Sequence, residues 1–250
     1  MKFNTDGLII YESPLGEKDR IVTVLTRTHG VIRGFVRGAT NIKSSKSAAT
    51  RLLCYSDISV YESKDKYIID SAESKEMFIP LRNDVVKMSL AQYFCQLCFE
   101  LCPTEVPAGE FLQLMLNSLY ILCRGDKPCD LVKSVFELRL LSLAGYMPDL
   151  LCCSDCGKFE DENMCFIPHK STIMCGECNK KEGYKSIKTG LGITAAMRHA
   201  IYAEPKKIFS FNLSSESLKQ LSSITEEYLK EKLCKSLPTL EFYKVIANTE

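Results

Sequence analysis

Two cysteine pairs stand at a spacing that favours a metal site. Cys153 and Cys156 form one C-x2-C pair, Cys175 and Cys178 form the other, and 18 residues separate the inner cysteines. This spacing allows two tight turns to present four thiolates to one tetrahedral Zn²⁺. Because four thiolates leave no open coordination position, we expect one structural zinc ion per chain, which contributes folding energy and no chemistry.

The residues around the pairs both support this site and leave alternatives open. Gly157 and Asn179 follow the two pairs and tolerate positive φ, so the chain can curl back towards the sulfurs. Cys152 competes with Cys153 for the first position, and Cys165 lies inside the loop. The alternatives to a zinc ribbon are therefore exchange between ligands, or disulfides in place of the metal.

Signatures of catalysis are missing from the sequence. It has no G-x4-G-K-[ST], no G-x-G-x-x-G after a strand, no G-x-S-x-G and no H-E-x-x-H. A zinc deaminase needs H-x-E upstream of P-C-x-x-C, and here Cys152 and Met174 precede the two pairs. The carboxylates Glu17 and Asp19 stand in a predicted turn and are interpreted as solvated charges. We expect a protein that is not an enzyme.

The first eighty residues predict a small barrel. Hydrophobic residues alternate or run together in five short segments separated by turn residues. The predicted strands are Leu8–Tyr11, Arg20–Thr26, Val31–Arg37, Leu52–Tyr61 and Tyr67–Ala72. Five strands of this length are typical of an OB-fold, which binds oligonucleotides with one strand face and its flanking loops. Residues 38–50 predict a mobile loop that either closes over a phosphate backbone or only connects two strands.

After Pro80 the spacing of apolar residues becomes helical. The pattern predicts three helices of roughly fifteen to twenty residues in an antiparallel bundle, and two more over Thr194–Ala203 and Ser215–Leu233. Cys95 and Cys98 fall within the first helix and are interpreted as core residues. The expected fold class is α+β multidomain: an OB-fold barrel over residues 1–80, then a helical domain over 81–250 with a zinc-binding insertion at about 149–185.

Composition and the absence of long apolar runs indicate the cellular compartment. The chain has 250 residues, of which 46% are hydrophobic, enough to bury a sizeable core. No apolar run approaches the length that spans a bilayer, and the first residues lack the apolar stretch of a signal peptide. We expect a soluble cytosolic protein without a membrane partner.

Positive charge is concentrated in one short region. Residues 20–51 contain seven basic side chains and no Asp or Glu, whereas residues 1–19 carry −2 and residues 52–250 carry −4 in a chain of net charge +1. Such a region attracts phosphates and predicts a nucleic-acid partner; the alternative is a solvated surface. The candidate nucleic-acid-binding residues are Arg20, Arg27, Arg33, Arg37, Lys43, Lys46 and Arg51. Phe35 and Tyr55 are candidate stacking platforms, with the barrel core as their alternative place.

Three local patterns follow one another along the chain. The first is Leu15-Gly16-Glu17-Lys18-Asp19-Arg20 leading into Thr26-Arg27-Thr28-His29-Gly30. The second is Phe136-Glu137-Leu138-Arg139-Leu140-Leu141 running to Gly145-Tyr146-Met147-Pro148, and the third is the two cysteine pairs. Taken in this order, they resemble the RecO family of bacterial recombination mediators over nearly the whole chain. The doubled Cys152-Cys153 departs from the family pattern and leaves the first ligand open.

The resemblance implies an OB-fold, a helical C-terminal domain and a zinc element. It also implies an activity without chemical turnover: binding single- and double-stranded DNA, annealing complementary strands, and helping RecA load onto DNA coated by single-strand-binding protein. The implied partners are DNA, RecR, the C-terminal tail of single-strand-binding protein and, indirectly, RecA, in the cytoplasm at the nucleoid. Some family members lack the cysteines, so the metal is not expected to carry the activity.

Two other classes of function remain as alternatives. One is a zinc-ribbon OB-fold module that binds RNA or associates with a polymerase, because the barrel pattern does not separate RNA from DNA. The other is a redox protein that uses its cysteines in exchange chemistry.

Overall fold

The computed structural model describes residues 1–39, 45–63 and 66–249. The chain forms two compact units, one of residues 1–123 with 237–250 and one of residues 124–236. The domain boundary predicted at residue 80 marks the change from strands to helices, and as a boundary between domains it stays a prediction. In the described part of the chain, no helix is both long and apolar enough to cross a membrane.

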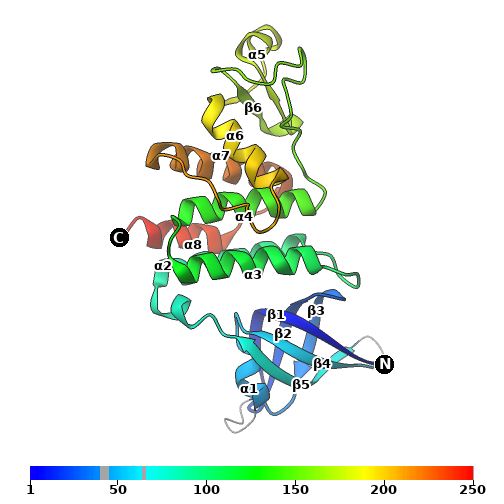
Figure 1. Ribbon diagram of the computed structural model, residues 1–250. Helices are drawn as coiled ribbons and strands as arrows, with labels where there is room; N and C mark the ends of the chain where they lie inside the picture. The colour runs from blue at the N-terminus through cyan, green and yellow to red at the C-terminus, as the bar shows by residue number, and fades with distance from the viewer. Residues whose placement is uncertain (40–44, 64–65, 250) are drawn as a thin grey trace. The chain divides into compact units, whose positions relative to one another are not determined.

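The first unit begins with the predicted five-stranded barrel, which the structure confirms (Figure 1). The strands are β1 (Lys2–Leu15), β2 (Asp19–Thr26), β3 (Gly30–Val36), β4 (Tyr55–Ser63) and β5 (Lys66–Glu76). They close in the order β1-β2-β3-β5-β4, with only the short β3–β5 pairing parallel. Gly34 faces the interior, where a Cβ would lie 2.9 Å from Ile69 Cδ1, so glycine lets Ile69 fill the barrel.

Strand β1 is much longer than the predicted Leu8–Tyr11. Its first half pairs with β4, from Lys2 opposite Tyr61 onward, and its second half pairs with β2 as far as Leu15 opposite Asp19. A shift in register between Ile9 and Tyr11 lets one strand serve both partners. The apolar pattern did not predict the two ends of β1, because the residues there are mostly polar and face solvent.

The predicted loop over residues 38–50 is wrong in part, since its described residues include the helix α1 (Ser45–Ala49), while residues 40–44 lie outside the described residues. Ala39 and Ala49 are fully buried and belong to the barrel core. Five residues are too few to show helical periodicity, and the contact with the barrel holds the helix in place. Similarly, β4 begins at Tyr55 and not at Leu52, because Leu53 adopts a φ of 60° in a turn.

Helices complete the first unit. They are the 3₁₀ turn η1 (Ile79–Asn83), α2 (Val85–Leu101), α3 (Gly109–Arg124) and α8 (Pro238–Ala247). The link between α2 and α3 meets the barrel at Gly30, whose φ is 62° and whose Cβ would lie 2.1 Å from the Pro103 carbonyl oxygen. No prediction covered α8, which packs on α2 and donates the Thr239 N–H to Gln96 Oε1 at 3.3 Å.

The second unit joins helices to a small zinc-ribbon-like sheet. Its elements are α4 (Cys129–Leu143), β6 (Cys165–Ile167), η2 (Pro168–Lys170), β7 (Thr172–Met174), α5 (Gly176–Glu182), β8 (Ile187–Lys188), α6 (Gly190–Tyr202) and α7 (Ser215–Leu233). The sheet has the order β7-β6-β8, and α4 packs against both α6 and α7. Ser214 caps α7 by accepting the Ser217 N–H at 3.2 Å. The predicted helices here are confirmed.

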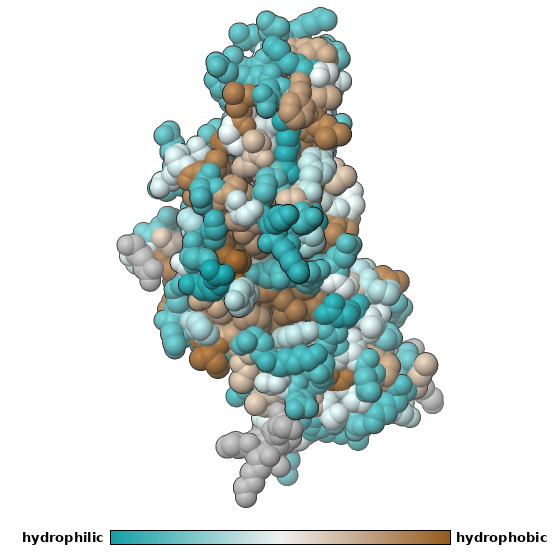
Figure 2. Space-filling view, in the orientation of Figure 1, coloured by the Kyte–Doolittle hydropathy of each residue, from teal (hydrophilic) through white to brown (hydrophobic). Residues whose placement is uncertain are grey.

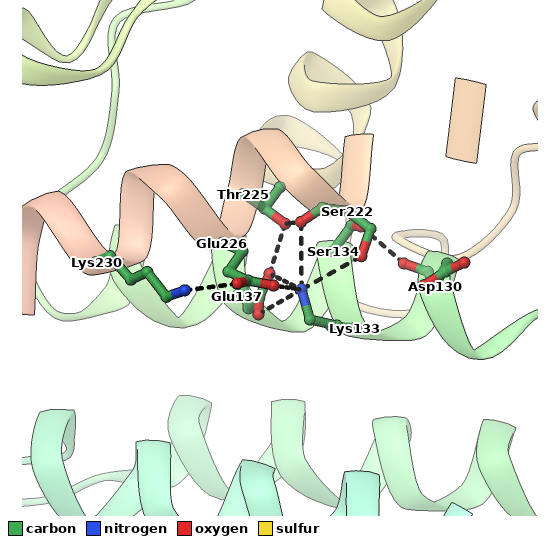
Figure 3. Close-up of polar contacts among 8 residues, drawn as sticks. All are labelled: Asp130, Lys133, Ser134, Glu137, Ser222, Thr225, Glu226 and Lys230. Carbon is green, nitrogen blue, oxygen red and sulfur yellow. Dashed lines mark hydrogen bonds and ion pairs between the residues drawn. The ribbon is translucent and has the colours of Figure 1, made fainter. Parts of the chain in front are cut away.

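A buried polar cluster fixes α4 against α7 (Figure 3). Lys133 is 1% exposed, and its Nζ lies 3.0 Å from Glu137 Oε1 and 3.7 Å from Glu226 Oε2. Thr225 donates a 2.5 Å hydrogen bond to Glu137 Oε2, and Lys133 donates to the Ser222 carbonyl at 3.2 Å. Charges removed from water in this way are tolerated only with such partners, so they specify one alignment of the helices.

Removing one member of this cluster is expected to destabilise the second unit. Lys133→Met leaves Glu137 buried without the Lys133 ammonium, at a cost of about 3–5 kcal/mol in the free energy of unfolding. The double variant Lys133→Met/Glu137→Leu should recover most of that loss, because no unpaired charge remains. Urea unfolding measures both. The control is Lys230→Met, whose 46% exposed side chain pairs with Glu226 and should contribute less than about 1 kcal/mol; equal losses for Lys133→Met and the control would contradict the expectation.

Candidate metal centre and nucleic-acid interface

Two tight turns position the four predicted metal ligands. In the first, the Gly157 N–H donates to the Cys153 carbonyl at 2.9 Å, and Gly157 adopts the expected positive φ of 73°. In the second, Cys175 stands at the N-cap of α5, and its Sγ accepts the Cys178 N–H at 3.5 Å. The expectation of positive φ at Asn179 is wrong, because that residue lies within α5. Backbone N–H groups of both turns donate to sulfur, those of Asp155 and Cys156 to Cys153 and that of Cys178 to Cys175.

The sulfur atoms of Cys153, Cys156, Cys175 and Cys178 all lie within 4.8 Å of one another. Cys156 Sγ and Cys175 Sγ are 3.7 Å apart. A tetrahedral centre with metal–sulfur bonds of ~2.3 Å places its sulfurs ~3.8 Å apart. The four cysteines therefore form a cluster that fits a tetrahedral metal ion and could hold one.

Neither competing cysteine belongs to this cluster in the structure. Cys165 donates to the Asn163 carbonyl at 3.3 Å, and Cys152 is half-buried next to Cys153. All thirteen cysteines are free thiols in the described chain. The arrangement thus separates four clustered sulfurs from their two neighbours in sequence.

The electrostatics of the cluster favour a cation. Burial disfavours the Cys153 thiolate, but hydrogen bonds from the backbone of Cys156, Cys175 and Asp155 outweigh it and lower its pKa to about 6. The pKa of Cys178 is instead raised, by Asp155 and by the neighbouring sulfurs. Four thiolates at this distance repel one another, and a divalent cation relieves that repulsion.

The candidate basic residues of the barrel fall into groups with different surroundings. Arg20 is only 7% exposed, and its Nη1 lies 3.2 Å from Glu12 Oε2. Arg51 has a 57% exposed side chain and lies 3.6 Å from the other oxygen of Glu12. Lys46 is half-exposed on α1, and Lys43 lies outside the described residues. Of these, Arg20 is the residue that the structure withdraws from solvent.

Arg27 is held by a carboxylate. Its Nε and Nη2 donate to both oxygens of Asp6 at 2.7–3.0 Å, and Tyr55 donates a 2.5 Å hydrogen bond to the same carboxylate. Burial would raise the pKa of Asp6, but the hydrogen bonds from Arg27 and Tyr55 outweigh it and lower the pKa to about 2. Tyr55 is therefore committed to this contact through its hydroxyl group.

One face of β3 presents a basic and aromatic stripe. Arg33 and Arg37 are exposed and Phe35 is half-buried between them, whereas Ile32 and Val36 are buried in the barrel. Alternate residues of a strand face the same side, so Arg33 and Phe35 lie on the outer surface of β3, and the exposed Arg37 directly follows its last residue. Among the described residues, neither Arg33 nor Arg37 forms an ion pair. We define Arg33, Phe35 and Arg37 as the β3 stripe.

Sequence reasoning missed the carboxylates that organise this region. Asp19 is not only a solvated charge, because its Oδ1 accepts the Gly38 N–H at 2.9 Å. Glu12 and Asp6 also pair with arginines far along the chain. No local sequence pattern predicts these contacts. The alternation of residues along β1 indicates only on which face of the strand each carboxylate lies. The visible surface of the barrel is mainly hydrophilic (Figure 2).

Comparison with known proteins relates nearly the whole chain to one protein family. Residues 1–78 match the family model described as Recombination protein O N terminal, and residues 82–241 match Recombination protein O C terminal. The chain is similar to the DNA repair protein RecO of Acetivibrio thermocellus, with 34% identity over 97% of this chain and 96% of that protein. It is also similar to DNA repair protein RecO of Heliobacterium modesticaldum, with 29% identity over 98% of this chain and 89% of the relative.

The cysteine cluster predicts one metal ion per purified chain. Cys156→Ser and Cys178→Ser each remove a sulfur, so metal content should fall well below one and the thermal midpoint of unfolding should drop, since binding a structural metal stabilises the fold. Elemental analysis of the protein after dialysis measures the content. Cys165→Ser is the matched control and should keep the metal. If Cys152→Ser loses the metal while Cys153→Ser retains it, the assignment of the first ligand is wrong.

The Asp6–Arg27 contact predicts a specific response to acid. A carboxylate whose pKa is lowered to about 2 on folding contributes stability that is present above its unfolded pKa of ~3.9 and is lost as pH falls from about 4 to 2. Because Arg27 is 47% exposed, we expect on the order of 1 kcal/mol. Asp6→Asn should flatten this part of the stability curve in urea unfolding at each pH. An unchanged slope between pH 4 and 2 would show that the contact does not stabilise the fold.

Proposed function

Because the chain belongs to the RecO family, whose curated members are DNA repair proteins, we propose that it binds single- and double-stranded DNA and anneals complementary strands in homologous recombination. The protein acts without catalysing a reaction. Annealing requires two strands that repel each other to be held close, and basic side chains achieve this by neutralising phosphates and releasing counterions. The protein would then work in the cytoplasm at the nucleoid.

The β3 stripe is the observation that carries this proposal. An oligonucleotide-binding barrel uses a strand face, and here that face carries a guanidinium and an aromatic ring, with a second guanidinium directly after the strand. Unpaired arginines can meet successive phosphates, while an aromatic ring can stack on a base. Phe35 stands opposite Ile21 on β2, so the two side chains are cross-strand neighbours on the same face. Arg27, Arg51 and Lys46 are the other described candidates for phosphate contacts, and Lys43 remains a candidate from the sequence alone.

We propose zinc as the metal of the cysteine cluster, with a structural role. Soft thiolates in tetrahedral geometry suit Zn²⁺ and leave it no open position. When bound, the ion supplies no chemistry beyond fixing the two turns. The metal analysis described above identifies it.

The helical parts are proposed to meet protein partners: RecR, the C-terminal tail of single-strand-binding protein and, through them, RecA. In the first unit, three large apolar side chains support such contacts. Phe99 on α2 is 59% exposed, and Phe242 and Val245 on α8 are 51% and 65% exposed. Exposed apolar side chains on helices can receive a short hydrophobic segment of another protein.

An annealing assay tests this function. Two complementary fluorescent oligonucleotides are mixed with the protein over a salt series, bare or coated with single-strand-binding protein. We expect acceleration that survives the coating and fades with salt. Arg33→Ala/Arg37→Ala should slow annealing several-fold and lower the slope of log K against log salt on single strands by about 1.4, or ~0.7 for each phosphate that is no longer neutralised.

Lys219→Ala is the matched control, because it removes an exposed positive charge from α7. It should change neither the annealing rate nor the slope. Folded, metal-loaded protein that fails to accelerate annealing at any salt would overturn the proposal. A strong preference for RNA over single-stranded DNA would instead favour an RNA-binding module.

A further inference from the structure

Two consecutive residues, Asp19 and Arg20, hold both ends of the connection from β3 to β4. Asp19 Oδ1 accepts the N–H of Gly38, where the connection begins, at 2.9 Å. Arg20 Nη1 donates to the carbonyl oxygens of Ser47 and Thr50 at 3.3 and 3.1 Å, and lies 3.2 Å from Thr50 Oγ1. Ser47 and Thr50, which follow Arg20 by 27 and 30 positions in the sequence, are thereby bound to the start of β2.

Arg20 is built into the barrel and does not face a ligand. It is 7% exposed, and Glu12 Oε2 compensates its charge at 3.2 Å as an ion pair. Its Nη1 is directed inward, to a carboxylate and to carbonyl acceptors within the barrel. A phosphate cannot bind this nitrogen without breaking these contacts.

Further hydrogen bonds extend from Arg20 to α1. Thr50 Oγ1, which Arg20 contacts, donates to the Lys46 carbonyl at 2.8 Å. On the other side of α1, Ser56 Oγ donates to the Ala49 carbonyl at 2.8 Å. The backbone that carries the half-exposed Lys46 is thus fixed by side chains of β2, β4 and the turn after α1.

The strand register brings this anchor close to the β3 stripe. Arg20 stands opposite Val36, the last residue of β3, and Asp19 binds the amide of Gly38. Arg37, which lies between Val36 and Gly38 and directly follows β3, is therefore at the same end of the barrel. Arg37 and Lys46 therefore project from backbone segments that Asp19 and Arg20 hold. Fixing charged side chains before binding removes part of the ordering entropy that binding otherwise costs.

We infer that Asp19 and Arg20 are positioning residues for DNA binding, which fix the backbone of Arg37–Gly38 and α1 so that Arg37 and Lys46 meet phosphates. This assigns Arg20 a different role from direct contact with DNA, and it rests on the proposed function. Arg20 acts through Lys46, and Asp19 acts through Arg37. The inference concerns only described residues of the connection.

A double-mutant cycle on the full-length, metal-loaded protein tests it. Affinity for a single-stranded oligonucleotide is measured over a salt series for Arg20→Ala, Lys46→Ala and the double variant. Lys46→Ala should lower the salt slope by about 0.7, which corresponds to one neutralised phosphate. Arg20→Ala should lower it by the same amount, and the double variant should bind no more weakly than either single variant, because both changes act on the same phosphate.

Arg20→Lys separates positioning from charge. It keeps the positive charge, but lysine Nζ lies one bond short of the position of Arg20 Nη1, the atom that donates to both Ser47 and Thr50. We expect it to behave like Arg20→Ala in the salt slope. A slope equal to that of the wild type in Arg20→Lys, together with additive losses of affinity in the cycle, would show that Arg20 contacts phosphate directly and would overturn the inference.

Hydrogen exchange without DNA provides an independent readout. The amides of Thr50 and Arg51 donate to the carbonyls of Lys46 and Ala48, so their exchange reports the order of α1. Arg20→Ala should speed their exchange, whereas Lys46→Ala should not. Unchanged protection in Arg20→Ala would overturn the inference.

Asp19→Ala with Arg37→Ala forms a second cycle at the other end, which serves if Arg20→Ala fails to fold. Alanine removes the oxygen that accepts the Gly38 N–H, whereas asparagine would keep it. The same non-additivity is expected, and additive losses of affinity would count against positioning. Two failures are distinguishable. If the wild type does not bind DNA, the proposed function falls and this inference with it. If the wild type binds and Arg33→Ala weakens binding, but both cycles are additive, only the inference falls.

Discussion

Closure of the five-stranded sheet is the constraint on which the barrel depends. Because every strand has a neighbour on each side, the inward residues must fill a closed interior, and charged groups are left with the outer faces and the two ends. The parallel pairing of Gly34 and Phe35 with Tyr67 and Ile68 completes the circle. Gly34 makes room for Ile69 inside, while the residues that alternate with it face outward and form the β3 stripe.

Closure of the barrel leaves some charged side chains buried and others exposed. Arg20 is drawn inward at the end of the barrel, where Glu12 and carbonyl oxygens compensate it, whereas Arg33 and Arg37 stay in water. The second unit also contains a buried ion pair, formed by Lys133 and Glu137 between α4 and α7. Buried charges of this kind add specificity of alignment more than they add stability. Exposed charges are the ones free to attract a polyanion.

The metal cluster solves a different problem. The sheet of β6, β7 and β8 has strands of only two or three residues, which provide few ladder hydrogen bonds and little apolar surface. A metal ion held by the four cysteines of the two turns would supply the missing stabilisation for such a small element. Cys153 and Cys175 are buried with Ile167 and Met174, so two of the four cysteines also belong to the apolar core of this element.

The sequence by itself determined the elements whose information is local: the five strands, the long helices and the cysteine pairs, because periodicity and spacing are written in neighbouring residues. It did not reveal α1 or α8, which are short and depend on packing against a barrel and on α2. It also could not distinguish Arg20 from Arg33, since both are arginines in predicted strands of one basic region. Only the tertiary structure decided that, because the difference lies in contacts with Glu12, Ser47 and Thr50, which closure of the barrel brings together.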